Sequence, residues 1–245
     1  MRDVMDTHTH TLASGHAYNT MTEMMQSAAE KGLELLAITD HAPAMPGSTH
    51  QFYFSNSDMI DRDYYTQKFG GKTRYLIGAE LNILPGGEVD LPEKNLKKLD
   101  ITIASMHVPC YKPSTIEDHT RDYLLILQNP HVHVIGHPDD GRYPVDYRAL
   151  VATAKANHKV LELNSHSLDP RSTRQNAHEN DTCMLKLCME YQQPIIINSD
   201  AHTELEIGNH TYAWRLIEEL NFPEDLILNT SVEKLLPYLN TSRVQ

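Results

Sequence analysis

Short apolar segments alternate with amphipathic segments along this chain, and the alternation limits the folds it can adopt. Seven segments are short, rich in β-branched residues and bounded by turn residues, at 1–8, 33–41, 75–80, 101–107, 133–137, 160–164 and 195–200. This composition is typical of buried parallel strands. Helix-like segments lie between them, at 21–31, 116–128, 145–157, 182–191 and 212–220. Because seven units show no evident edge strand, we predict an α/β fold that closes into a barrel through right-handed crossovers.

Length and charge restrict the class of protein further. A chain of 245 residues with 40% apolar composition can bury a large core, and no break in composition divides it, so we expect one domain over residues 1–245. The net charge of −12 and the lack of a basic stripe disfavour a nucleic-acid partner. No signal-peptide pattern and no long apolar run are present, so we expect a cytoplasmic protein without membrane contact.

Titratable residues gather where the predicted strands end. His8, His41, Glu80, His107, His137 and Asp200 each stand at the carboxyl end of a predicted strand, and His10, His16 and His202 follow just beyond. The carboxyl ends of barrel strands form the face that carries the active site in barrel enzymes. The alternative, six independent groups satisfied by chance hydrogen bonds on one rim, requires far more coincidence.

The first of these motifs has the geometry of a metal site. Side chains alternate across a strand, so His8 and His10 point to the same side and can bind one cation together. Neutral imidazole suits zinc, manganese or iron. Three cysteines, at Cys110, Cys183 and Cys188, show no CxxC spacing, and we expect reduced thiols. The sequence therefore predicts a multi-metal hydrolase site built from histidine and carboxylate.

The loop after the sixth predicted strand offers groups for an anionic substrate. Arg171 and Arg174 carry planar forks that match phosphate, although solvated surface arginines are the alternative. His166 stands just past the same strand and is a candidate for substrate contact. Six other histidines fall in polar segments where a solvated side chain is expected: His50, His119, His131, His158, His178 and His210.

Two features near the second predicted strand have open interpretations. Residues 42–57 form a long connection with Phe52, Tyr53 and Phe54, which is either a lid over the cleft or a packed surface segment. Asp40, beside His41, either orients a ligand imidazole or caps a backbone amide.

Taken together, the motifs resemble the polymerase and histidinol phosphatase (PHP) family, in particular its small stand-alone phosphatases. The resemblance covers nearly the whole chain in order, with all nine ligand positions filled, and is carried by residues 6–11 (DTHTHT), 14–18 (SGHAY), 38–41 (ITDH), 78–80 (GAE), 105–107 (SMH), 136–138 (GHP) and 198–202 (NSDAH). It implies a distorted (β/α)7 TIM-like barrel with three divalent metal ions, zinc first, manganese or iron as alternatives.

The resemblance also implies how the ligands group. One ion would be held by His8, His10, Glu80 and Asp200, a second by the bridging Glu80 with His107 and His137, and a third by His16, His41 and His202. The position of Arg171 relative to Asn164 resembles that of the family's phosphate-binding arginine, which makes Arg171 the first choice over Arg174.

The implied activity is hydrolysis of small phosphomonoesters by a hydroxide that bridges two metals, with L-histidinol phosphate as one candidate substrate. The bridging hydroxide would be held by Glu80, His8, His10 and Asp200. Alternatives are a nuclease-type phosphodiesterase, disfavoured by the acidic charge, and an amidohydrolase, disfavoured because no predicted strand ends in the lysine that often bridges metals there. A non-catalytic metal store is more remote.

Overall fold

Seven parallel strands form the centre of the molecule, in the spatial order β1-β2-β3-β5-β6-β7-β8. The structure, a computed structural model, describes residues 2–239. The strands are β1 (Met5–Asp6), β2 (Leu35–Ile38), β3 (Arg74–Leu84), β5 (Ile101–Ser105), β6 (Val134–Ile135), β7 (Val160–Asn164) and β8 (Ile195–Asn198). Each strand overlaps one of the seven predicted segments. Met1, in the first of these segments, lies outside the described residues.

The sheet curves until its first and last strands meet. Thr9 forms a parallel bridge with Ala201, and the amide of His10 donates to the carbonyl of Ala201 at 2.8 Å. The amide and hydroxyl of Thr7 both donate to the side-chain oxygen of Asn198, each at 2.8 Å. Because side chains complete a contact that the strand ladder alone does not, the barrel is nearly closed and distorted, as predicted.

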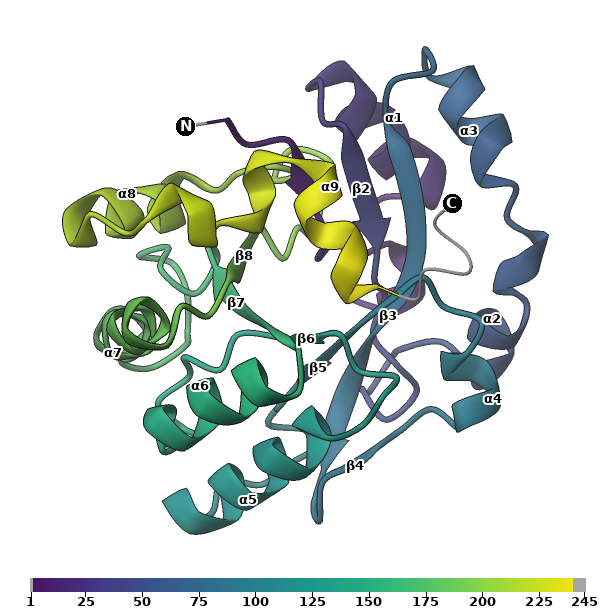
Figure 1. The fold of residues 1–245 in the computed structure, drawn as a ribbon. Helices are drawn as coiled ribbons and strands as arrows, with labels where there is room; N and C mark the ends of the chain where they lie inside the picture. Colours follow the sequence, from purple (N-terminus) through teal and green to yellow (C-terminus); the bar gives the residue numbers. More distant parts are fainter. Residues whose placement is uncertain (1, 240–245) are drawn as a thin grey trace.

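Helices cover the outside of the barrel (Figure 1). The helices α5, α6, α7 and α8 follow one another along one side, and α1, α2, α3 and α4 lie on the other. Their bounds are α1 (Met21–Glu30), α2 (Gln51–Ser55), α3 (Arg62–Lys68), α4 (Glu93–Leu96), α5 (Ile116–Leu127), α6 (Tyr147–Ala156), α7 (Ala177–Tyr191), α8 (Thr211–Leu220) and α9 (Val232–Leu235). Among residues 2–239, no helix combines the length and apolar character needed to cross a membrane.

The strand β3 is longer than the sequence predicts. It continues past Glu80 to Leu84 and turns back into the short antiparallel strand β4 (Glu88–Val89), with Ile83 opposite Val89. The expectation that Glu80 ends a strand is therefore wrong, because the hairpin extends β3 beyond its parallel neighbours. Glu80 lies inside the strand, opposite Ile103 of β5 in the ladder.

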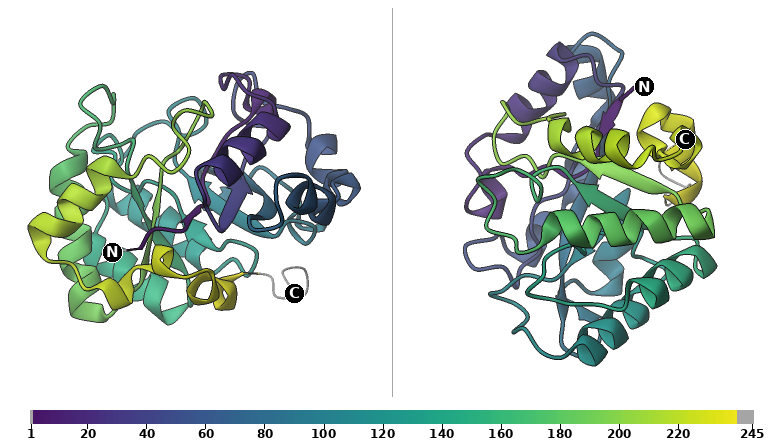
Figure 2. Two further views of the ribbon diagram at one scale, coloured as in Figure 1. Left: turned by 90° about the horizontal axis from the view of Figure 1, so that it is seen from above. Right: turned by 90° about the vertical axis from the view of Figure 1, so that its left-hand side faces the viewer.

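The inside of the barrel changes from apolar to polar along its axis. Leu76, Ile101, Val160 and Ile196 pack together at the end where the strands begin. The same apolar cluster includes Val232, Leu235 and Leu228 from the C-terminal segment, so α9 covers this end. Long loops lie at the opposite end of the molecule from α9 (Figure 2). Alternate residues of each strand face the inside of the barrel. Further along the same strands, the inward-facing positions are occupied by polar residues.

The connection after β2 is packed onto the barrel. Phe54 in α2 is 1% exposed, and the hydroxyl of Tyr53 donates to Asp40 at 2.8 Å. Phe52 is instead 71% exposed. Two of the three aromatic residues thus anchor the segment, which favours the packed interpretation over a mobile lid.

Candidate metal centre

Glu80 is the centre of the polar cluster at the carboxyl end of the barrel. Its side chain is 1% exposed. Five imidazoles each have a ring nitrogen 2.7–3.6 Å from one of the two carboxylate oxygens. These belong to His8, His10, His41, His107 and His137. All five histidines follow their strands by two to four residues, so the ends of four strands, β1, β2, β5 and β6, converge on the carboxylate that the middle of β3 supplies.

Asp200 forms the second anionic point of the cluster. Its Oδ1 lies 3.2 Å from Nε2 of His10 and 3.6 Å from Nε2 of His8. The backbone of Asp200 has φ 55°, a left-handed conformation that turns the chain just after β8. This turn is what directs the carboxylate inward, next to the first histidine pair.

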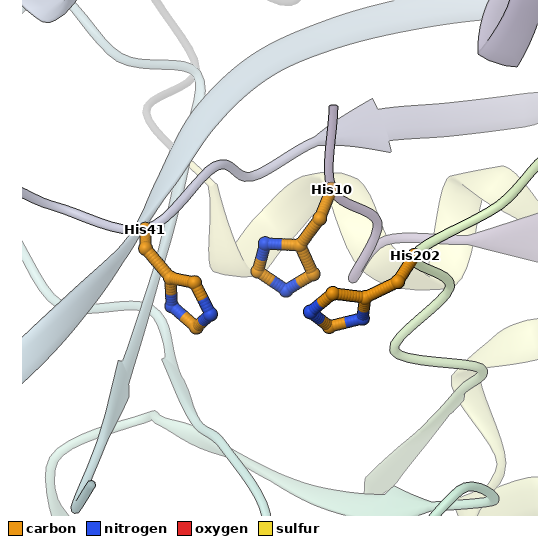
Figure 3. Close-up of side chains that lie close together, drawn as sticks. All are labelled: His10, His41 and His202. Atoms are coloured by element: carbon orange, nitrogen blue, oxygen red, sulfur yellow. The ribbon is translucent and has the colours of Figure 1, made fainter. Parts of the chain in front are cut away.

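Three sets of side chains offer ligand atoms within 4.8 Å of one another. The sets are His8 with His10 and Asp200, His41 with Glu80 and His107, and His10 with His41 and His202. The rings of the third set come from three separate segments and face a common space (Figure 3). His16 is exposed, with its ring centroid 4.9 Å from that of His41 and 4.8 Å from that of His202.

The structure thus brings all nine predicted ligand residues together, and some of them lie close to more than one of the expected ion sites. His41 contacts Glu80 at 2.7 Å as well as lying beside His16, and His10 belongs to two of the three sets. Which ion each histidine would bind depends on the orientation of its ring, and that orientation depends on the backbone beyond the strand. The assignment of ligands to individual ions therefore stays a proposal.

Four of the imidazoles have their second ring nitrogen held by a neighbour. Nδ1 of His10 lies 3.0 Å from the hydroxyl of Ser14, and Nδ1 of His107 lies 2.8 Å from the side-chain oxygen of Asn82. The corresponding partners are the carboxylate of Glu162 for His8 and the carbonyl of Asp200 for His202. Such outer hydrogen bonds fix the tautomer and orientation of metal-binding histidines.

Asp40 acts through Ser14 and not directly on an imidazole. It accepts hydrogen bonds from the amide of Thr11 at 2.6 Å and from the hydroxyl of Ser14 at 2.7 Å. Both roles considered for Asp40, capping an amide and orienting a ligand, are therefore combined in one carboxylate.

The inner atoms of the cluster fit a divalent cation. Nε2 of His8, His10 and His202, Nδ1 of His41 and Oε2 of Glu80 are buried and have no hydrogen-bond partner among the described residues. A buried polar atom without a partner costs free energy, whereas a cation bound between these atoms would satisfy all of them. Imidazole with carboxylate is a donor set that zinc, manganese and iron accept.

The charges of the cluster also favour a cation. Burial raises the pKa of Glu80, but His107, His8 and His41 outweigh it and hold that pKa well below its ordinary value. The pKa of Asp200 is likewise held low against burial by His8, His10 and Arg174. Burial, reinforced by His41 and His202, lowers the pKa of His10 well below its ordinary value. Burial lowers the pKa of His8 as well, but Glu162, Glu80 and Asp200 outweigh it and raise that pKa well above its ordinary value, so a metal that binds His8 displaces a proton from this ring.

A cleft of about 550 Å³ opens over the exposed side of the cluster. Its polar lining includes His166, Arg174, Asp140 and Arg142, and its apolar lining includes Met45, Met106, Val108 and Pro109. Arg174 donates to Asp200 at 2.9 Å and to the hydroxyl of Ser167 at 2.7 Å. An anion in the cleft could reach both the metal ligands and this guanidinium.

Arg171 lies differently from Arg174. Its side chain is 74% exposed and pairs with Asp169 at 2.6 Å, whereas the side chain of Arg174 is 14% exposed and lines the cleft. His166, the third predicted substrate-binding residue, also lines the cleft. The geometry thus places Arg174 and His166, but not Arg171, against the space over the cluster.

Sequence reasoning missed Glu162, which is 0% exposed and touches the cluster through His8. The available signal was an acidic residue inside the apolar strand Val160–Asn164, on the strand face shared with Asn164. Two histidines expected in solvent are buried instead. His119 accepts a hydrogen bond from the amide of Ser114, which is nearby in sequence. His210 lies between Asp3 and Asp6, which are distant in sequence.

Known proteins match this chain in sequence and in fold. A probable phosphatase of Acetivibrio thermocellus is 40% identical over 99% of this chain and 98% of its own length. A probable phosphatase of Caldicellulosiruptor saccharolyticus is 43% identical over 96% of this chain and 95% of its own. In fold, the chain is similar to the histidinol phosphate phosphatase of Lactococcus lactis, solved with zinc, L-histidinol and phosphate, with a TM-score of 0.61 at 18% identity, covering 90% of this chain and 95% of that one. Residues 6–168 match the PHP domain, and the chain belongs to the PHP domain family.

Proposed function

We propose that this protein hydrolyses small phosphomonoesters in the cleft above Glu80, with three divalent metal ions, zinc first among them, held by the clustered histidines and carboxylates. The phosphoesterase class follows from membership of the PHP family and from relatives of about 40% identity that are named probable phosphatases. The observation that carries the proposal is a buried carboxylate approached by five imidazoles beneath a cleft that also presents an arginine.

In this proposal His8, His10, Glu80 and Asp200 would hold one ion, and Glu80 with His107 and His137 would hold a second. His16, His41 and His202 would hold the third, at the open side of the cluster. When bound, such ions supply an activated water and neutralise the oxygens of the phosphoryl group.

The protein groups around the ions orient the substrate. Arg174 lines the cleft and is held in place by Asp200 and Ser167, so its remaining N–H groups would be the donors to the phosphate. Met45, Met106, Val108 and Pro109 form an apolar surface for the body of the leaving alcohol. The pKa of the Cys110 thiol is raised to about 11, chiefly by burial, so it stays protonated and is a poor nucleophile. In this proposal water, and not a side-chain nucleophile, attacks the phosphorus.

The test is phosphate release from an aryl phosphomonoester by chelator-treated protein, before and after zinc or manganese is added. We expect turnover only with metal, and none from Glu80→Ala, because that variant removes the carboxylate shared by the ion sites. Turnover of a diester or oligonucleotide in place of the monoester would overturn the proposal and favour the phosphodiesterase alternative, and turnover of an amide would favour the amidohydrolase alternative.

The leaving group is the finer question. The zinc-containing Lactococcus lactis structure holds L-histidinol and phosphate, so L-histidinol phosphate belongs in the first substrate panel. A preference for it over sugar phosphates, measured as kcat/KM, would extend the similarity from fold to substrate. Equal rates on all small monoesters would place specificity outside this cleft.

A further inference from the structure

We propose that Glu162 is a positioning residue that holds His8 and His137 together, so that replacing it weakens two neighbouring ion sites at once. The inference deepens the proposed function, on whose metal dependence it rests. Glu162 lies in β7, below the ligand cluster, and is completely buried.

Four hydrogen-bond donors converge on the two oxygens of Glu162. Oε1 lies 2.7 Å from Nδ1 of His8 and 2.8 Å from Nδ2 of Asn198. Oε2 lies 2.7 Å from the backbone nitrogen of His137 and 3.1 Å from Nδ2 of Asn164. One carboxylate thereby joins the ends of four strands, β1, β6, β7 and β8.

Three of these four partners can only donate. The His137 partner is a backbone N–H. The side-chain oxygen of Asn198 accepts from the amide of Thr7, and that of Asn164 accepts from the amide of Ser167, so both amide groups must turn their NH2 toward Glu162. An acceptor is therefore required at both oxygens, which a carboxylate provides and a glutamine does not. A glutamine would place its own NH2 against at least one donor.

The contact decides the state of His8. With Nδ1 donating to Glu162, the lone pair of the neutral ring is on Nε2, the atom that faces Glu80 at 3.3 Å and Asp200 at 3.6 Å. A carboxylate at this distance both selects the tautomer and increases the basicity of the coordinating nitrogen. The outer nitrogens of His10, His107 and His202 face neutral oxygens instead.

The contact also holds the backbone of His137. This residue has φ 28°, outside the usual range for a side chain with a Cβ, just after β6 ends. Its N–H is held by Glu162, and its Nε2 lies 2.9 Å from Glu80. The preceding Gly136 is packed against β5, because a Cβ there would lie 2.2 Å from the hydroxyl oxygen of Ser105. Glu162 thus fixes the approach angle of a second ligand in a different ion site.

The experiment compares Glu162→Gln with Asn82→Ala, which removes the outer partner of a single ligand ring, His107. Zinc is titrated into chelator-stripped protein against a competing chromophoric chelator, and bound zinc is counted by elemental analysis. We expect Glu162→Gln to weaken two zinc equivalents together, each about 10- to 100-fold, and Asn82→Ala to weaken one. In ¹⁵N-histidine spectra of the zinc-loaded protein, His8 should be the Nδ1–H tautomer in the wild type, and Glu162→Gln should show a mixture of states for this ring.

Wild-type zinc affinity in Glu162→Gln, or weakening of one equivalent alone, would overturn the inference. If Glu162→Gln does not fold, Glu162→Asp replaces it, since aspartate keeps the charge and all acceptor positions but is one methylene shorter. That variant should weaken the same two equivalents to a smaller extent, and unchanged binding would again overturn the inference.

These readouts do not depend on turnover. Paired loss of zinc in a protein that hydrolyses no phosphomonoester would support the role of Glu162 and reject the proposed function. If Glu162→Gln weakens no pair of zinc sites in a protein that is an active phosphatase, the role of Glu162 is rejected and the proposed function is supported. A wild-type protein that binds no divalent cation would reject both the role of Glu162 and the proposed function.

Discussion

Single side chains divide the metal centre into a buried and an exposed part. His8, His10 and Glu80 have side chains no more than 1% exposed, whereas the side chain of His202 is 24% exposed and faces the cleft. The buried residues are out of reach of a substrate and contact only protein groups and a bound ion, so they set the geometry. The exposed residues can also contact a substrate, which makes the rim the place where recognition occurs.

Arg174 and Arg171 provide a matched pair on one loop for testing that recognition. Arg174→Ala should raise KM for an aryl phosphate several-fold or more, because it removes the guanidinium that lines the cleft. Arg171→Ala, which removes an exposed side chain paired with Asp169, should change KM less. Steady-state kinetics measure both variants, and a larger KM effect in Arg171→Ala would return the phosphate site to that residue.

His210 links stability to pH at the other end of the first strand. Burial alone lowers its pKa, but hydrogen bonds to Asp3 and Asp6 outweigh burial and raise it to about 10. Because the folded pKa lies above the unfolded value, the imidazolium stabilises the protein fully below about pH 6.5, and that stabilisation is lost as the pH rises toward 10. The free energy of unfolding should fall by up to roughly 1.4 kcal/mol per pH unit in this interval.

The measurement is denaturant unfolding between pH 6 and 10 for the wild type and for His210→Gln. The difference between the two should shrink as the pH rises, since only the wild type has this proton to lose. A constant difference would show that His210 is not protonated in the folded protein.

At the scale of elements, two connecting segments support one another beside the metal centre. Gly15 has φ 82°, and a Cβ on it would lie 2.1 Å from the carbonyl oxygen of Gly47. The first segment carries His16, and the second follows His41. Close backbone contact between them therefore fixes the relative position of two predicted ligands.

Gly15→Ala should lower both stability and zinc affinity, because the backbones must separate. Gly32→Ala is the control, since Gly32 has φ 76° with nothing within 4 Å of its Cβ position. The control should show only the left-handed strain, about 1 kcal/mol, or a melting temperature lower by about 2–4 °C. Equal melting temperatures and equal zinc affinities for the two variants would contradict the proposed support.

The elements themselves were largely predictable, for physical reasons that differ from strand to strand. Buried parallel strands need continuous β-branched sequence, so segments such as Ile195–Asn198 stand out. The end of β3 could not be predicted in this way, because its extension depends on the hairpin with β4 and not on local propensity. The nine ligand residues follow from strand ends meeting at one rim. Their grouping does not, because residues such as His137 and Asp200 adopt left-handed backbones that no residue pattern announces.

Long-range partners explain the remaining differences. His210 meets Asp3 across 207 positions of sequence, and nothing near either residue indicates the contact. The sequence also did not indicate which arginine lines the cleft. Arg171 pairs with Asp169, two residues away, whereas Arg174 reaches Asp200.

For the whole molecule, metal binding and folding should be coupled. The cluster draws ligands from six of the seven parallel strands or the segments that follow them, so an ion bound only in the folded state stabilises the entire barrel. Zinc at about 100 times its dissociation constant should add about 2.7 kcal/mol per independent site. Calorimetry should show a melting temperature that falls after chelation and recovers with zinc, and Glu80→Ala should recover less. A melting temperature unaffected by chelation would argue against the coupling.

The position of Glu80 within β3 determines which insertions and deletions the fold can accept. Loops after β2, β6 and β7 can change length while their strand ends stay in place. Between Arg74 and Glu80 the chain is paired throughout, to β2 at residues 74–77 and to β5 from Gly78 onward. Adding or deleting one residue there would reverse the alternation and turn Glu80 outward, toward the helices. Variation in length is therefore expected around the rim of this barrel and excluded from the first half of its longest strand.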